Sequence, residues 1–230
     1  MKKGWITLAV TDLVLLLLCL MIYRSRQTCL QMVWGSSFLA EYKKENQKRI
    51  ALTFDDGPHP VYTEELLDGL KERGVQATFF VTGEHAEKYP EIIKRMQEEG
   101  HLIGNHTYSH IQLKKANEEK FREELIETSR VIREITGKDT MYVRPPYGSW
   151  DRAIEKELNM FSVLWTIDPT DWKCLNADAV SQRVLRKVKE NSIILLHDSY
   201  ASSVEAALQI TDELLREGYS FVTVEALLVE

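Results

Sequence analysis

The sequence predicts a parallel α/β fold, in which strands and helices alternate, behind an apolar N-terminal segment. Short runs rich in β-branched and aromatic residues recur along residues 48–230, and segments with helical spacing of apolar residues separate them. Several of the helical segments stop at a glycine, as helices commonly do. With 230 residues, 44% of them apolar, the chain suits one large domain or two small ones.

The first half of this body has three expected strands and two helices between them. The segment 77–81 (ATFFV) has the β-branched and aromatic composition of a buried strand. The expected strands are residues 50–54, 77–81 and 101–104. The expected helices are residues 61–74 and 84–99, which stop at Gly74 and before Gly100.

The second half continues the alternation to the end of the chain. A long charged helix over 117–136 stops at Gly137, and the short strand 142–144 meets two prolines. The remaining expected strands are residues 161–167, 192–196 and 220–224. The remaining expected helices are residues 152–158, 177–189 and 204–217. Six or seven strand–helix units imply a parallel sheet, either open and doubly wound or closed as a barrel.

Charge and cysteine content exclude several classes of protein. The net charge of −6 combines an excess of five cations in residues 1–49 with an excess of eleven anions in residues 50–230. An acidic body is a poor partner for nucleic acid, and the lack of a glycine-rich phosphate loop argues against a nucleotide. Cys19, Cys29 and Cys174 are scattered, so the sequence contains no disulfide framework and no CxxC metal site.

Residues 1–26 are typical of a membrane-targeting segment. The apolar run 5–23 contains one charge, Asp12, and would reach roughly 28 Å as a helix, close to the thickness of a bilayer core. Arg24-Ser-Arg-Gln follows the run and lacks the small residues of a signal-peptidase site, so we favour an uncleaved anchor over a cleaved signal peptide. We expect a stalk over 27–47 and a folded domain over 48–230 outside the cell membrane; secretion is the alternative.

Five polar clusters follow the predicted strands, at the edge where active residues of a parallel sheet collect. They are residues 53–58 (TFDDGP), 106–110 (HTYSH), 144–148 (RPPYG), 168–172 (DPTDW) and 195–198 (LLHD). Each alone has an ordinary explanation: an acidic turn, a surface histidine pair, a proline turn or a core histidine. If the HxxxH segment forms a helical turn, its two histidines face the same way and can share a metal.

Together the clusters offer one carboxylate and two imidazoles for a divalent ion, with positions left open for water and substrate. They also offer a second carboxylate with a cation to hold it, and a histidine with a carboxylate partner. These are the parts of metal-assisted hydrolysis with a separate base and acid.

The five motifs resemble, in order, those of the polysaccharide deacetylases, the NodB-homology family or carbohydrate esterase family 4. The resemblance covers about residues 48–228. It implies a distorted, incomplete (β/α) barrel and an activity that removes N-acetyl, sometimes O-acetyl, groups from glycans such as peptidoglycan and chitin.

By motif position, the resemblance also implies a metal site and a base. Asp56, His106 and His110 would bind the metal, usually zinc, with cobalt as another divalent candidate. Asp55 would be the general base that activates the attacking water, and Arg144 would tether it.

The remaining motif positions imply an acid and a substrate groove. His197 would protonate the departing amine, and Asp171 would hold and orient it. The backbone N–H of Tyr147 would stabilise the oxyanion. Trp172 and Leu195 would form an apolar groove for the sugar ring and the acetyl methyl group. With the anchor, this favours an envelope N-acetylhexosamine polymer, most simply peptidoglycan; chitin oligomers and acetylated xylan are the alternatives.

Three other classes of function remain alternatives. Two histidines and a carboxylate also form the iron site of non-haem oxygenases. A glycan-binding module without catalysis would keep Trp172 and not need Asp55. Metal-independent relatives that act on cyclic amides would not need Asp56, His106 and His110.

Several reactive side chains match no motif position. His59, His85 and His101 are such residues, and for His59 a loop position is favoured over substrate contact. Cys174 has no motif residue to act as its base, so packing is favoured for it.

Overall fold

The structure is a computed structural model that describes residues 20–24 and 48–228, and it divides into a unit up to Gln47 and a unit from Lys48 onward. Residues 20–24 are helical. Within these two described ranges, no helix has both the length and the apolar character needed to cross a bilayer. The predicted anchor over 1–26 lies outside the described residues except for 20–24, and the predicted stalk lies wholly outside them.

A parallel sheet of seven strands forms the centre of residues 48–228. The strands are β1 (Arg49–Asp55), β2 (Thr78–Val81), β3 (Leu102–Asn105), β4 (Tyr142–Val143), β5 (Phe161–Ser162), β6 (Ile193–His197) and β7 (Ser220–Phe221). They lie in the order β5-β4-β3-β2-β1-β6, and β7 pairs with the first two residues of β1. All pairs are parallel, which confirms the sheet predicted from the alternation of elements.

The segment that begins with β5 closes this sheet. β5 pairs with β4, and five residues later Ile167 pairs with Ile194 of β6, at the opposite edge of the sheet. Val163 N donates to the carbonyl oxygen of Val143 at 2.8 Å, and Leu195 N donates to that of Ile167 at 2.9 Å. The predicted strand 161–167 is therefore a crossing segment that joins both edges into an irregular barrel.

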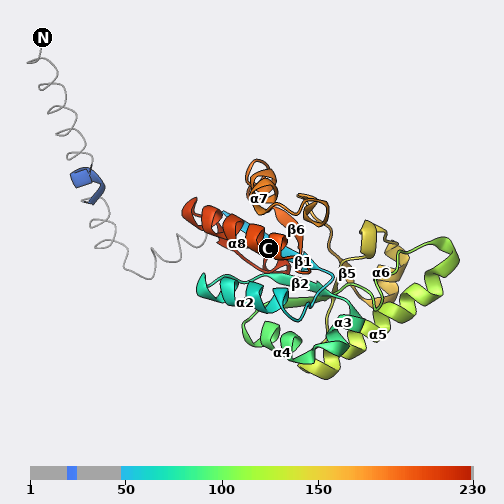
Figure 1. Ribbon diagram of the computed structural model, residues 1–230. Helices are drawn as coiled ribbons and strands as arrows, with labels where there is room; N and C mark the ends of the chain where they lie inside the picture. Colours follow the sequence, from blue (N-terminus) through green and yellow to red (C-terminus); the bar gives the residue numbers. More distant parts are fainter. Residues whose placement is uncertain (1–19, 25–47, 229–230) are drawn as a thin grey trace, which may run out of the picture. The chain divides into compact units, whose positions relative to one another are not determined.

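Helices cover the outside of the strands (Figure 1). They are α2 (Tyr62–Glu72), α3 (Gly83–Lys88), α4 (Pro90–Glu98), α5 (Glu118–Thr136), α6 (Arg152–Leu158), α7 (Ala177–Leu185), α8 (Ala201–Arg216) and α9 (Val224–Leu228). Short 3-10 turns lie at Lys115–Asn117, Pro146–Gly148 and Asp171–Lys173.

Two sequence predictions for these elements are wrong in detail. The helix predicted over 84–99 is two helices, because Pro90 lacks an N–H and begins α4 instead of continuing α3. The last predicted strand, 220–224, ends at Phe221 and is followed by α9.

The core lies on both faces of the strands. Every residue of β1 after Arg49 is buried, and all four residues of β2 are buried. Strands covered on both faces read as continuous apolar runs without alternation, which explains the composition of residues 50–54 and 77–81. The first polar side chains come where these strands end, so the packed strands set the positions of the candidate site residues.

Candidate active site

Polar residues from several strands meet at the carboxyl edge of the barrel. Asp55 is the last residue of β1 and is the register partner of His197, the last residue of β6. His106 directly follows β3, and Arg144 directly follows β4. The sheet therefore places the predicted base and the predicted acid on adjacent strands.

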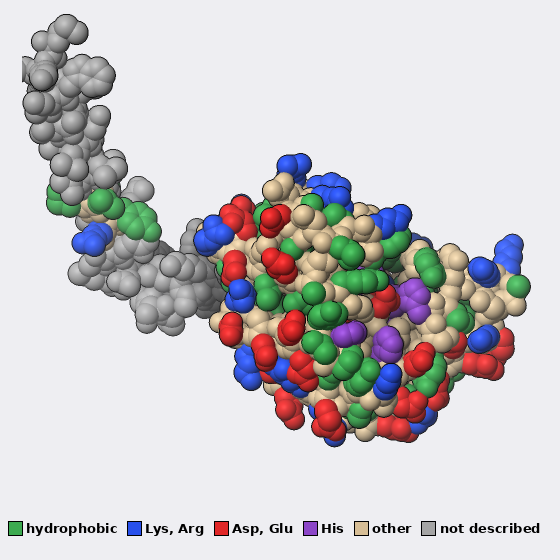
Figure 2. Space-filling model, in the orientation of Figure 1, with side chains coloured by type: hydrophobic (Ala, Val, Ile, Leu, Met, Phe, Trp, Pro, Cys, Tyr) green, Lys and Arg blue, Asp and Glu red, His purple; other side chains and the backbone are tan. Residues whose placement is uncertain are grey.

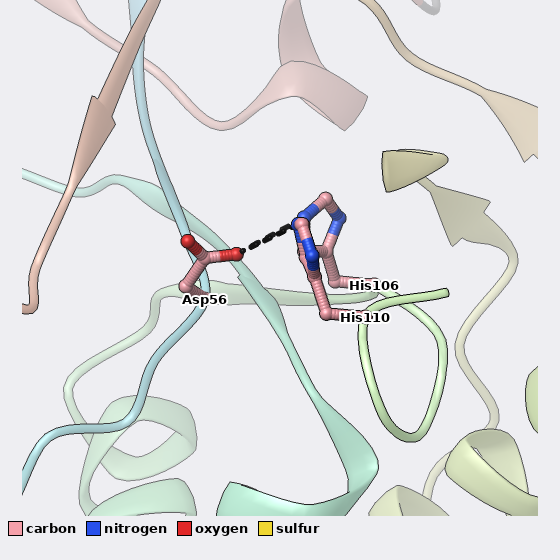
Figure 3. A group of neighbouring side chains, drawn as sticks. All are labelled: Asp56, His106 and His110. Carbon is pink, nitrogen blue, oxygen red and sulfur yellow. Dashed lines mark ion pairs between the residues drawn. The ribbon is translucent and has the colours of Figure 1, made fainter. Parts of the chain in front are cut away.

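Asp56, His106 and His110 face one another (Figure 3). Asp56 Oδ1 lies 3.3 Å from Nε2 of His106 and 3.3 Å from Nε2 of His110. One ligand atom from each of the three residues lies within 4.8 Å of the others. These distances are short enough for one cation to contact all three groups.

The hydrogen bonds around this group leave lone pairs directed at its centre. His106 Nδ1 lies 2.5 Å from the carbonyl oxygen of Arg144, which can only accept, so Nδ1 carries the hydrogen and Nε2 of the neutral ring a lone pair. Asp56 Oδ1 is buried and receives no hydrogen bond from the described residues. An unpartnered carboxylate oxygen beside the lone pair of His106 and the ring of His110 fits a cation, and an N, N, O donor set suits zinc or cobalt.

The protonation states agree with a cation site. Burial lowers the pKa of His110, an effect that the charge of Asp56 partly offsets, so the ring tends to be neutral and able to ligate. Burial raises the pKa of Asp56, but the interactions with His106, His110 and His197 outweigh this and lower the pKa to about 2. Asp56 is therefore ionised at neutral pH.

The two histidines reach this site from a loop and not from the helical turn that the sequence analysis considered. Residues 106–110 have no helical assignment, and Thr107 and His110 have φ values of 63° and 57°. Asn105 Oδ1 accepts from the N–H of Thr107 at 2.8 Å, and both the N–H and the hydroxyl of Ser109 donate to the carboxylate of Glu124 in α5. Side-chain hydrogen bonds thus hold a loop that sequence spacing alone cannot distinguish from a helical turn.

Left-handed backbone recurs across the motifs. Asp56 (φ 73°), Tyr147 (φ 60°) and Thr170 (φ 55°) adopt it, as do the two residues of the histidine loop. This conformation is uncommon for residues other than glycine and concentrates at functional sites. Four of the five motifs therefore contain a turn in this conformation.

Arg144 and Asp55 form a buried ion pair. Arg144 Nη1 lies 2.9 Å from Asp55 Oδ1, and the exposed fractions of the two side chains are 0% and 5%. The same nitrogen donates to the hydroxyl of Thr53 at 2.7 Å. Asp55 Oδ2 lies 3.9 Å from Nε2 of His106, so the carboxylate that Arg144 holds borders the cation site.

His197 and Asp171 form a second pair across the site. His197 Nδ1 lies 2.9 Å from Asp171 Oδ1, and Asp171 Oδ2 accepts from the backbone N–H of His197 at 2.9 Å. Burial lowers the pKa of His197, but Asp171, with the charges of Asp55 and Asp56, outweighs this and raises the pKa to about 9. His197 is therefore protonated at neutral pH and can donate a proton.

Apolar side chains surround the polar centre. In the space-filling view, histidine side chains gather on one face, with acidic and hydrophobic side chains beside them (Figure 2). Exposed apolar residues that follow the carboxyl ends of strands, between 40% and 72% exposed, are Tyr147, Leu164, Trp172, Leu175 and Tyr200.

The three residues predicted to bind the substrate differ in how accessible their side chains are. The Tyr147 ring packs edge-on against His110, with 5.1 Å between ring centroids, and the Lys173 ammonium group lies 4.3 Å from the centre of the Trp172 ring. Leu195 is only 5% exposed and lies on the same face of β6 as His197, so it can form the floor of the site but not a platform for a sugar ring.

The histidines outside the motifs have different roles. His59 Nδ1 accepts from the N–H groups of Val61 and Tyr62 at the start of α2, which fits the loop role favoured from the sequence. His101 Nδ1 accepts from Ala77 N at the amino end of the sheet, away from the site. His85 lies against the site: its Nδ1 is 2.8 Å from the carbonyl oxygen of Asp56. Nothing in the spacing of His85 signals this contact, because it depends on how α3 approaches the first motif.

Asp198, the last residue of the fifth motif, is a second residue to which sequence reasoning gave no role. Its carboxyl group is fully buried, and Oδ2 accepts from the hydroxyl of Thr63 at 2.5 Å. Burial raises the pKa of this carboxyl to about 7. A side chain at position 57 would collide with the carboxyl group, so Gly57 allows the first and fifth motifs to pack together.

Known proteins are similar to this chain in sequence and in fold. The family described as polysaccharide deacetylase matches residues 42–163. A peptidoglycan-N-acetylglucosamine deacetylase from Bacillus cereus is 41% identical over 79% of this chain and 69% of its own length. The peptidoglycan-N-acetylmuramic acid deacetylase PdaC from Bacillus subtilis is 41% identical over 79% of this chain, which spans 39% of that protein.

Solved structures agree with the sequence comparison. The structure of the peptidoglycan deacetylase PdaC from Bacillus subtilis superposes with a TM-score of 0.77 and 41% identity, over 79% of this chain and 90% of that one. A CE4 family pseudoenzyme from Bacillus anthracis superposes with a TM-score of 0.73 and 30% identity, over 79% of this chain and 66% of that one. On its sequence and its fold, the chain belongs to the polysaccharide deacetylase family.

Proposed function

We propose that this chain is a metal-dependent deacetylase that hydrolyses the N-acetyl groups of an N-acetylhexosamine polymer of the bacterial envelope, most simply peptidoglycan. The observation that carries the proposal is the convergence of Asp56, His106 and His110, with Asp55 and His197 beside them. Because the family includes a pseudoenzyme, membership alone is not sufficient support for activity. The support comes from the complete set of candidate groups in this chain.

Asp56, His106 and His110 would hold the metal, with zinc the first candidate and cobalt a second. A divalent cation bound there would supply Lewis-acid activation of water and of the amide carbonyl. His106 is oriented for this role by its hydrogen bond to Arg144 O, and Asp56 supplies the negative charge.

Asp55 is the proposed general base, and Arg144 is its partner. The guanidinium group occupies Oδ1 and leaves Oδ2 on the side of His106, where it can accept a proton from the attacking water. Because Arg144 is wholly buried, its guanidinium group cannot exchange Asp55 for water. The carboxylate of Asp55 therefore keeps one orientation.

His197 is the proposed general acid. Asp171 holds Nδ1, so Nε2 is the nitrogen available to protonate the departing amine. The raised pKa keeps this proton on the ring at neutral pH. The backbone N–H of Tyr147 remains the proposed donor to the oxyanion. This residue lies in a turn and has a left-handed backbone conformation.

The rim of the site supports a glycan substrate. Exposed Trp172 and Tyr200 offer aromatic surface beside a polar centre, which suits the apolar face and hydroxyl edge of a sugar ring. The relatives named for peptidoglycan favour that polymer for this chain. Chitin oligomers and acetylated xylan remain alternatives, because a chitooligosaccharide deacetylase and an acetyl xylan esterase are also related.

The other classes of function have less support. An iron oxygenase would leave the Arg144–Asp55 and Asp171–His197 pairs without a role. A binding module would not need those pairs either. A metal-independent enzyme would not need lone pairs directed at one point.

The substrate is tested by acetate release from purified glycans. After a chelator has removed the metal, the chain should release no acetate. Reloading it with zinc or cobalt should restore the release of acetate from peptidoglycan. Release from acetylated xylan alone would instead support the esterase alternative. No release from any glycan by the reloaded chain would contradict the proposed function.

Substitutions should separate metal binding from proton transfer. Asp56→Ala, His106→Ala and His110→Ala should lose bound metal and activity together. Asp55→Asn and His197→Ala should retain metal but lose about 10²- to 10⁴-fold in rate, the usual contribution of a positioned base or acid. Metal content after gel filtration and acetate release measure the two effects. Loss of metal from His197→Ala would show that the division of roles is wrong.

The pKa of His197 should control the alkaline side of the pH profile. In the metal-free chain, NMR titration should give a pKa of about 9, and Asp171→Asn should lower it toward the ordinary value of about 6.5. Well below its pKa, His197 is fully protonated and can act as the acid. It loses this proton as the pH rises through the pKa, so activity should fall at high pH. In Asp171→Asn that fall should move to lower pH. An unchanged titration in this variant would contradict the pairing.

We also propose that residues 1–26 anchor the chain in the cell membrane, with the catalytic domain outside the cytoplasm. The apolar run 5–23 between flanking cations supports this. On cell fractionation, full-length protein should sediment with membranes and be released by detergent. External protease should degrade the catalytic domain in intact protoplasts. A shortened, freely secreted form would favour a cleaved signal peptide.

A further inference from the structure

One short segment contacts both loops that carry the proposed metal ligands. The backbone N–H of Thr82 donates to Gly57 O at 3.1 Å, next to Asp56. The N–H groups of Gly83 and Glu84 donate to the carbonyl oxygens of Thr107 and Tyr108, both at 3.0 Å. Residues 82–85, at the start of α3, therefore join the loop of the first motif to the loop of the two histidines.

The two ligand-carrying loops need contacts from other parts of the fold to hold their backbone conformation. Asp56, Thr107 and His110 are in left-handed conformations that are unfavourable for residues with a Cβ atom. Such turns persist only where surrounding contacts fix them. The hydrogen bonds from residues 82–85 end on carbonyl groups at or beside the strained residues, so they are in place to fix the turns.

The approach of α3 to the histidine loop is close. A Cβ atom at Gly83 would collide with the ring of Tyr108 and would lie 3.1 Å from its Cα. Only glycine allows the two N–H groups of α3 to reach the loop carbonyls. This contact therefore belongs to the packing of the fold.

The fourth bond of this segment comes from a side chain. His85 Nδ1 lies 2.8 Å from Asp56 O, and since a carbonyl oxygen can only accept, Nδ1 is the donor. We propose that His85 is a positioning residue for the metal site. By holding the carbonyl group of Asp56, it fixes the backbone turn that directs the Asp56 carboxylate at His106 and His110. This inference rests on the metal site of the proposed function but not on the identity of the glycan.

The test measures cobalt binding to the full-length, metal-free chain by its visible absorption spectrum. His85→Phe removes the donor and should weaken Co²⁺ affinity by about 10- to 100-fold, the usual effect of losing a partner that orients a ligand. His85→Asn keeps an N–H donor close to the position of Nδ1 and should recover affinity to within a few-fold of the parent chain. Thermal unfolding of each metal-free variant shows that it is folded.

His101→Phe is the matched control. Like the change at His85, it removes an imidazole that makes one backbone hydrogen bond, here a buried ring at the amino end of the sheet. It should lower the melting temperature and leave Co²⁺ affinity unchanged.

Each contrary outcome has a separate meaning. If the parent chain binds no Co²⁺, the proposed metal site is wrong, and the inference is wrong with it. If the parent chain binds Co²⁺ and His85→Phe binds equally well, only the positioning role is overturned. The role is also overturned if His85→Asn is as weak as His85→Phe, or if His101→Phe weakens binding to the same extent.

Discussion

The guanidinium group of Arg144 is wholly buried and connects the parts of the barrel that form the site. It donates to Asp55 and Thr53 on β1 and to the carbonyl oxygens of Val163 and Leu164 in the segment that closes the barrel. Its Cζ atom also lies over the ring of Phe80, 4.3 Å from the ring centre. Removing one partner of a buried ion pair costs about 3–5 kcal/mol, because the other charge is left without compensation. The position of the proposed base and the closure of the barrel therefore depend on the same side chain.

The same residue connects the base to the metal site through its backbone. Arg144 N donates to Asn105 O at 2.9 Å, and Arg144 O accepts from His106 Nδ1. The side chain of Arg144 thus neutralises Asp55, while its carbonyl group sets the tautomer of a proposed ligand. Asp55 and Asp56 are adjacent carboxylates that would repel each other. Their partners differ: Asp55 faces the guanidinium group of Arg144, and Asp56 faces two imidazoles. The two carboxylates can therefore have separate functions.

The sequence predicted much of the frame and of the site, for identifiable reasons. Continuous apolar runs such as 77–81 predicted buried strands, and the polar residues directly after them, such as Asp55 and His197, lie together because parallel strands end at one edge. Local spacing could not predict that residues 106–110 form a loop, since i and i+4 residues also meet on a helix. It could not reveal the contact of His85 either, because that contact is set by tertiary packing between α3 and the first motif.

The left-handed turns of the site are held by hydrogen bonds within the protein. Here the carbonyl groups of Asp56, Thr107 and Tyr108 are already occupied by donors from the start of α3. These bonds within the protein offset part of the conformational entropy lost when the loops are ordered. A preorganised site of this kind reserves the energy of substrate binding for the transition state, where preorganised groups contribute most to catalysis.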